Sequence, residues 1–210
     1  MIVTNRRALV ALVAALSLTA CAKPPAEAIS AAEQAQQAAV AAGADEYSPE
    51  AMNAVTEAKA ALDAEIAAQA EKMSLTRSYK RAEELAAAYK TAGDQAAAAA
   101  VAAKEQAKNE ATTLITEGRM ALDEATAMLA SAPRGKGSRA DLAAMQADLE
   151  AAGMSLTEAE TSLANGMFLD ARSKATSAKE AIQRVKDAVT QAQAARLNFG
   201  PILLSTAATA

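Results

Sequence analysis

The fold of this chain is decided by residues 142–163, which read LAAMQADLEAAGMSLTEAETSL. Leucine, methionine or alanine recurs there at alternating intervals of three and four residues, at positions 142, 145, 149, 152, 156, 159 and 163. That spacing is the a/d seam of a heptad repeat, which places one apolar stripe along a helix. Because such a stripe must be covered by other helices, the stretch predicts an α-helix packed in a bundle.

The neighbouring segments on both sides repeat this pattern. After Asn165-Gly166, a pair suited to ending a helix in the left-handed conformation, apolar residues recur at positions 168, 171, 175, 178, 182, 185, 189 and 192. So short a connection makes the two helices antiparallel neighbours. Upstream, a third seam runs through Ile115, Gly118, Leu122, Ala125 and Leu129 and ends at residues 132–137, APRGKG. Ser138 with Asp141 resembles a capping box that starts the next helix.

Residues 27–105 predict a second set of three helices. The first is expected to end near Gly43, and Ser48 to cap the next, with Pro49 in its first turn, where a missing N–H costs nothing. The apolar face of that second helix comprises Met52, Val55, Leu62, Ile66 and Met73. After a tight connection at residues 74–76, the third helix is expected to be lined by Leu75, Tyr79, Ala82, Ala86, Tyr89 and Gly93.

The sequence therefore predicts an all-α protein of elongated antiparallel helical hairpins, forming two three-helix, coiled-coil-like units at residues 27–105 and 106–197. Seam positions of the two units stand 89 or 90 residues apart, which favours an internal duplication, although alanine-rich helices also match by chance. No proline interrupts residues 77–130, so the units can share one long helix. Gly93 and Gly118 each cost that helix about 1 kcal/mol relative to alanine. Gly153, followed by Ser155 and Glu158, is an alternative break within the helix at 142–163, although its seam keeps phase there.

Composition agrees with helix and predicts a thin core. Alanine, the strongest helix former, is the dominant residue, and the prolines stand only at expected breaks. When alanine alternates with leucine or methionine along a seam, the distance between packed helix axes falls toward the lower end of its usual range of roughly 8–10 Å. We therefore expect a narrow bundle without a sizeable internal cavity, which argues against a buried cofactor.

The first twenty residues have the three parts of an export signal. Arg6 and Arg7 provide a positive start, residues 8–17 are apolar and uncharged, and small or apolar residues complete the segment. The segment is shorter than the about 20 apolar residues that a membrane span requires. We therefore expect residues 1–20 to be removed as a signal peptide, leaving an anchor and linker at 21–26 and a tail at 198–210.

The end of this signal, Leu18-Thr19-Ala20-Cys21, resembles the lipobox of bacterial lipoprotein precursors. The resemblance implies a diacylglyceryl thioether on Cys21, cleavage before it and acylation of the new amine, which together make a stable membrane anchor. Cys21 is the only cysteine, so no internal disulfide can form. An ordinary signal with an accidental cysteine is the alternative. Because Ala22 rather than Asp follows, the chain resembles lipoproteins sorted to the periplasmic face of the outer membrane.

Two motifs resemble a family of uncharacterised Gram-negative, alanine-rich helical lipoproteins. They are GADEYSPEAM at residues 43–52 and YKRAEELA at residues 79–86, and the resemblance covers about residues 25–105 plus the lipobox. It implies a helical hairpin. Some relatives continue into an outer-membrane-protein-A-like domain that grips peptidoglycan, and nothing after residue 105 resembles one. The murein lipoprotein is also similar but ends in a lysine joined to peptidoglycan, whereas this chain ends in Thr209-Ala210.

The residue inventory argues against catalysis. The chain has no histidine and no tryptophan, and acylation consumes its one thiol, so histidine acid–base catalysis, thiol catalysis and most zinc or copper sites are excluded. Gly135 and Gly137 lack the spacing of a phosphate-binding loop. We expect no enzyme and no cofactor beyond the lipid on Cys21. A net charge of -4, which becomes -6 without Arg6 and Arg7, argues against nucleic acid.

Two surface clusters are candidate contacts. Arg134, Lys136 and Arg139 make one loop basic, so it could meet an anionic envelope polymer, with a solvated loop as the alternative. An apolar patch in the tail comprises Phe199, Ile202, Leu203 and Leu204. The expected function is that of a membrane-anchored periplasmic spacer or scaffold. The alternative is an adaptor whose hairpins bind an envelope protein or peptidoglycan, and the oligomeric state is open.

Overall fold

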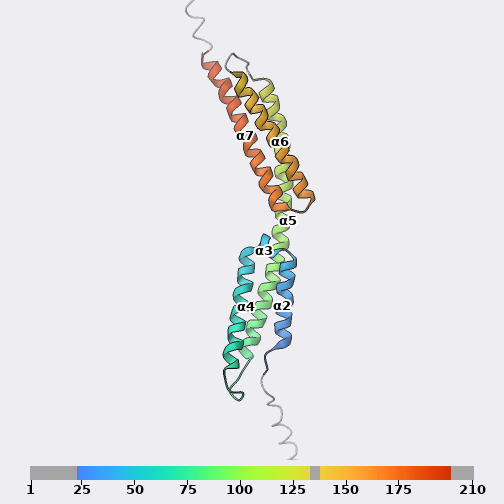
Figure 1. Ribbon diagram of the computed structural model, residues 1–210, viewed down its shortest axis with the longest axis vertical. Helices are drawn as coiled ribbons and strands as arrows, with labels where there is room; N and C mark the ends of the chain where they lie inside the picture. Colours follow the sequence, from blue (N-terminus) through green and yellow to red (C-terminus); the bar gives the residue numbers. More distant parts are fainter. Residues whose placement is uncertain (1–22, 133–137, 200–210) are drawn as a thin grey trace, which may run out of the picture. The chain divides into compact units, whose positions relative to one another are not determined.

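The computed structural model describes residues 23–132 and 138–199, and the regular structure in these residues is entirely helical (Figure 1). Its helices are α2 (Ala26–Ala41), α3 (Ala44–Tyr47), α4 (Pro49–Ala70), α5 (Lys80–Ala130), α6 (Ser138–Ala164) and α7 (Phe168–Phe199). The predicted all-α class is confirmed. The chain divides into unit 1, up to Ala103, and unit 2, from Lys104, and the unbroken helix α5 contributes to both.

Unit 1 packs α2, α4 and the first part of α5 around a core of small residues, with α3 as a short connection (Figure 1). Gly43 adopts a φ of 85° directly after α2, as the predicted break requires. The fully or nearly fully buried side chains include Ala32, Ala39, Val55, Leu62, Ala82, Ala86, Tyr89, Ala96 and Ala100. Alanine therefore provides most of this core, in agreement with the predicted narrow bundle.

Helix α2 approaches α5 closely at Gly93. A Cβ atom added at Gly93 would lie 2.8 Å from the carbonyl carbon and the Cβ of Ala35, and 2.9 Å from the backbone nitrogen of Gln36. One turn earlier on α5, the hydroxyl of Tyr89 donates a hydrogen bond to Oε1 of Gln36. Glycine at position 93 thus contributes a contact surface rather than a helix break.

The end of α4 differs from the prediction. Helix α4 stops at Ala70, and both Met73 and Leu75 lie outside the core, with 76% and 97% of their surface exposed. The cause is downstream: the guanidinium of Arg77 donates to the carbonyls of Ala70 (2.9 Å) and Lys72 (2.8 Å). Because these carbonyls are satisfied by a side chain, the backbone can leave the helix there.

The start of α4 also departs from expectation in one respect. Pro49 occupies the first turn as predicted, but Ser48 makes no capping hydrogen bond through its side chain. Its hydroxyl instead donates to the carbonyls of Ala44 and Ala96, both at 3.4 Å. Since Ala96 belongs to α5, the hydroxyl joins the α3–α4 connection to α5 and is not available to the first N–H groups of α4.

Unit 2 packs the second part of α5 against the antiparallel pair α6 and α7 (Figure 1). The predicted turn between α6 and α7 is confirmed: Gly166 has a φ of 78°, and the N–H of Met167 donates to the carbonyl of Ser162 at 2.9 Å. Helix α6 also continues through Gly153. The expected seam of α7 is buried from Ala171 to Val189, whereas Phe168 is partly buried and Ala192 is exposed.

The third helices of the two units bury equivalent positions. With an offset of 89 residues, six positions of α5 correspond to six of α7, and all twelve are buried: Ala82 and Ala171, Ala86 and Ala175, Tyr89 and Ala178, Gly93 and Ile182, Ala96 and Val185, Ala100 and Val189. The offset predicted from the seams therefore relates positions of equal burial. Met73, by contrast, is exposed, although its equivalent Leu163 packs against the core of unit 2.

Candidate functional site

The site residues predicted from the sequence fall outside the described part of the chain. Leu18, Thr19, Ala20 and Cys21 precede residue 23, and the structure neither supports nor opposes lipidation. Arg134 and Lys136 fall within the undescribed residues 133–137. Arg139 belongs to α6, but its side chain is not among those described. The tail residues Phe199, Ile202, Leu203 and Leu204 are likewise outside the described side chains.

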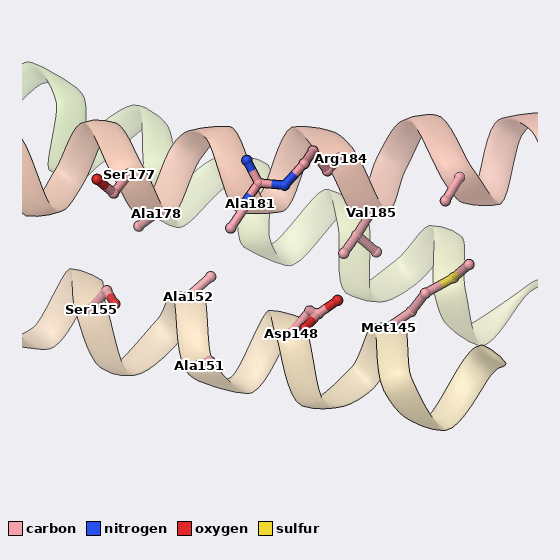
Figure 2. A pocket seen from close by; sticks show the side chains of 11 residues that line it. Met145, Asp148, Ala151, Ala152, Ser155, Ser177, Ala178, Ala181, Arg184 and Val185 are labelled. Atoms are coloured by element: carbon pink, nitrogen blue, oxygen red, sulfur yellow. The ribbon is translucent and has the colours of Figure 1, made fainter. Parts of the chain in front are cut away.

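A groove of about 560 Å³ lies between α6 and α7 in unit 2 (Figure 2). Its walls are built mostly from small residues, because alanine and serine on the facing helices leave space that longer side chains would fill. The lining residues are Met145, Asp148, Ala151, Ala152, Ser155, Ser177, Ala178, Ala181, Arg184, Val185 and Ala188. The groove was not predicted from the sequence, although the antiparallel pairing of its two helices was.

The groove carries one acidic and one basic group on opposite walls. Asp148 belongs to α6 and Arg184 to α7, and Figure 2 shows them on facing helices. Neither forms an ion pair with another described residue. Ser155 and Ser177 add hydroxyl groups to the walls. The groove therefore offers small apolar side chains, two hydroxyl groups and two opposite charges as contacts.

A regular ladder of ion pairs joins α5 to α7 across unit 2. Three acidic residues of α5 and three basic residues of α7 pair at intervals of seven residues: Arg172 with Glu110 at 2.9 Å, Lys179 with Glu117 at 2.5 Å, and Lys186 with Glu124 at 2.5 Å. The constant separation of 62 residues means that the two helices run parallel and in fixed register. These residues flank the seams: each acid directly precedes a buried seam position of α5, and each base directly follows one of α7.

A separate contact joins α5 to α6. The guanidinium of Arg119 donates to both carboxylate oxygens of Glu160, each at 2.9 Å, and to the hydroxyl of Thr157 at 3.0 Å. Hydrogen bonding from Arg119 lowers the pKa of Glu160 below the usual carboxyl range and correspondingly raises the pKa of Arg119. The bidentate geometry fixes the angle as well as the distance between the two helices.

A buried hydroxyl organises the α6–α7 turn. Ser162 is 2% exposed; its hydroxyl donates to Oδ2 of Asp170 at 2.6 Å and accepts from Nζ of Lys174 at 3.2 Å. The Ser162 hydroxyl, followed by Lys174, lowers the pKa of the Asp170 carboxyl. The acidic group lies in the first turn of α7, where the helix dipole also favours a negative charge. This cluster has a structural role that accounts for each of its members.

The described residues, 23–132 and 138–199, contain no group of three or more acidic, histidine or cysteine side chains placed to hold a metal ion. In the same residues no helix is both long and apolar enough to cross a membrane. No protein-family model, curated protein or solved structure matches the chain. The family resemblance of the motifs at residues 43–52 and 79–86 therefore stays a prediction.

Proposed function

We propose that the chain is a lipoprotein of the bacterial cell envelope, anchored through Cys21 to the periplasmic face of the outer membrane, and that its helical body serves as a structural spacer or scaffold. The observation that carries this proposal is the order of the first residues: a positive start, an apolar stretch and Leu18-Thr19-Ala20 leading directly into Cys21. The lipid on Cys21 supplies the attachment, and residues 27–197 supply the body.

Three features of the helical body support a spacer. Each unit has its own alanine-rich core. Within unit 2, the ladder of ion pairs fixes the register of α5 and α7, and the Arg119–Glu160 pair fixes α5 against α6. A spacer must keep its helices in a fixed register so that its length stays constant, and it does not require a reactive group. The residue inventory, with no histidine and one cysteine, supports a non-enzymatic role.

The anchor is tested by replacing Cys21 with serine in cells supplied with labelled palmitate. The parent chain is expected to incorporate the label, lose residues 1–20 and fractionate with the outer membrane. Cys21→Ser is expected to lose the label and to leave the membrane fraction. A serine variant that remains membrane-bound without label would overturn the anchor proposal.

A second candidate function, an adaptor, is favoured by the groove between α6 and α7. The discriminating experiment places a photoreactive amino acid either at Ser177, which lines the groove, or at Thr112, an exposed residue of α5 outside it. One stoichiometric protein crosslinked only from Ser177 favours the adaptor. Crosslinks between copies of the chain, or none, favour the spacer.

A further inference from the structure

The turn between α4 and α5, residues 71–79, exposes two large apolar side chains close together. Met73 and Leu75 have 76% and 97% of their surface exposed, the two highest values among the large apolar residues of the described chain. In unit 2, Leu163, the equivalent of Met73, packs against the core, while Met167 in the α6–α7 turn is 47% exposed. The α4–α5 turn therefore differs from the α6–α7 turn in exposing two large apolar side chains, each to a greater extent.

The turn is held in this shape by hydrogen bonds. Arg77 binds the carbonyls of Ala70 and Lys72, the N–H of Ser78 donates to the side-chain oxygen of Gln69 at 3.1 Å, and the N–H of Thr76 donates to a carbonyl within the turn at 2.9 Å. These bonds are made without using either apolar side chain. Met73 and Leu75 are thus presented to the solvent by an ordered backbone, which lowers the entropy cost of binding.

The same turn is positively charged in an acidic protein. Residues 71–81, which are the turn and the first two residues of α5, contain four basic residues, Lys72, Arg77, Lys80 and Arg81, and one acidic residue, Glu71, while the whole chain has a net charge of -4. Arg81 pairs with Glu84 at 2.8 Å and Arg77 binds backbone carbonyls, so Lys72 and Lys80 are the basic groups that carry the attraction to a headgroup. Apolar side chains surrounded by lysine and arginine suit the surface of a bilayer with anionic lipids, where each basic residue adds about 1 kcal/mol.

The turn lies at the end of unit 1 from which the chain leads to Cys21. Gln36 of α2 contacts Tyr89, and Ser48, which follows α2 and α3, contacts Ala96, so α2 runs parallel to the first part of α5. The start of α2 is then level with the start of α5, and Figure 1 shows the α4–α5 turn at that same end. Four residues lie between Cys21 and Ala26, so the five Cα–Cα steps span at most about 17 Å.

We propose that Met73 and Leu75 insert into the surface of the bilayer to which Cys21 is anchored, with the basic residues of the turn contacting anionic headgroups. The inference rests on the proposed lipid anchor, which places this end of unit 1 at a membrane. It deepens that proposal, because a second contact orients unit 1 on the bilayer, whereas a single lipid attachment only limits the distance of unit 1 from the bilayer.

The test uses a tryptophan as a unique reporter, since the chain has none. The processed chain, residues 21–210, carrying Leu75→Trp is coupled through the Cys21 thiol to maleimide lipids in vesicles of phosphatidylethanolamine and phosphatidylglycerol with brominated acyl chains. We expect the bromines to quench Trp emission. The matched control is Met154→Trp, because Met154 is also largely exposed, at 64%, but belongs to α6; it is expected to remain unquenched.

Binding without the tether measures the contribution of the two side chains. In a Cys21→Ser background, replacing Met73 and Leu75 by serine is expected to lower the vesicle partition coefficient roughly 100-fold, about tenfold for each side chain. Replacing Met120 and Met154, which are 61% and 64% exposed, is expected to change it less than about twofold.

Unquenched Trp at position 75 on tethered vesicles overturns the proposal, as does equal quenching at position 154. If Trp at position 75 is unquenched, the exposed side chains at positions 73 and 75 would instead contact a protein partner. The coupling is chemical, so the result does not depend on acylation in the cell. Metabolic labelling of Cys21 tests the anchor separately, and the two failures are distinguishable.

Discussion

Replacing Gly93 by alanine tests the close approach of α2 and α5. The same substitution at Gly153 is the matched control, since both glycines lie within helices and neither has a positive φ. At position 93 a Cβ would lie 2.8 Å from the backbone of Ala35. At position 153 its nearest neighbour is Cδ2 of Leu122 at 3.3 Å, the end of a half-exposed side chain that can rotate away.

The two substitutions are expected to change stability in opposite directions. Alanine gains about 1 kcal/mol over glycine in a helix interior at either position. At Gly93 the gain is outweighed, because contact with a backbone cannot be relieved by a rotamer change and such overpacking costs about 1–3 kcal/mol. We expect Gly93→Ala to destabilise by about 1–2 kcal/mol and Gly153→Ala to stabilise by about 0.5–1 kcal/mol. The propensity gain is common to both, so their difference isolates the packing cost.

Tyrosine fluorescence during urea unfolding measures the effect in unit 1 alone. All three tyrosines, Tyr47, Tyr79 and Tyr89, belong to unit 1, and the chain has no tryptophan. With a urea dependence of about 1–2 kcal/mol/M, the tyrosine midpoint of Gly93→Ala is expected to fall by about 1 M. Far-UV circular dichroism follows the helices of both units and is expected to show the stabilisation by Gly153→Ala.

A Gly93→Ala variant whose tyrosine midpoint equals or exceeds that of the parent would refute the close approach. It would mean that α2 moves away at no cost, which is incompatible with a core at this level formed by Ala35, Gly93 and the Tyr89–Gln36 hydrogen bond. A decrease for Gly153→Ala of the same size as for Gly93→Ala would show that alanine is unfavourable for reasons unrelated to packing.

Three further predictions concern ion pairs and burial. Glu117→Lys is expected to destabilise by about 0.5–1 kcal/mol, and adding Lys179→Glu to recover most of that loss, in a double-mutant cycle of urea midpoints. Because the pKa of Glu160 is lowered in the folded state, its contribution is present above the usual carboxyl range near 4.5 and is lost as pH falls through the lowered pKa. Glu160→Gln is therefore expected to cost about 0.5 kcal/mol at neutral pH and nothing at pH values well below that pKa, which thermal unfolding across pH measures. Leu62→Ala is expected to cost about 2–5 kcal/mol and Leu75→Ala less than about 0.5 kcal/mol, because the first side chain is 1% exposed and the second 97%.

The helices and most of their ends were predictable from local sequence. Gly166 ends α6 because glycine adopts a positive φ without steric cost, and Pro49 begins α4 because proline fixes φ near the helical value. The seams were predictable for a related reason: a three-and-four spacing leaves only one face of a helix apolar. Continuity of α5 through Gly93 and Gly118 was not decided by propensity, since each glycine is favoured by packing against a neighbour.

The predicted ends of α4 were wrong where a residue outside the helix determines the local structure. Met73 and Leu75 keep the seam spacing, yet Arg77 satisfies the carbonyls that end α4 and leaves both outside the core. Ser48 has the right identity for a cap but donates to Ala96, 48 residues away.

The candidate sites were predicted less well than the fold. The ladder of α5 and α7 could have been found, because acids at 110, 117 and 124 and bases at 172, 179 and 186 share a seven-residue interval. The groove between α6 and α7 could not, since its volume depends on how closely two helices pack.

The alanine-lined core of unit 1 restricts how this protein can evolve. Ala32, Ala39, Ala82 and Ala86 are fully buried, so almost every substitution there enlarges the side chain, and only glycine makes it smaller. Selection on such a core acts in one direction, against size, and leaves the outward faces free to change. Homologues with this helical body are therefore expected to keep small residues at the same regular spacing while their exposed helix surfaces diverge. Their common origin would then be easier to recognise from that spacing than from overall sequence identity.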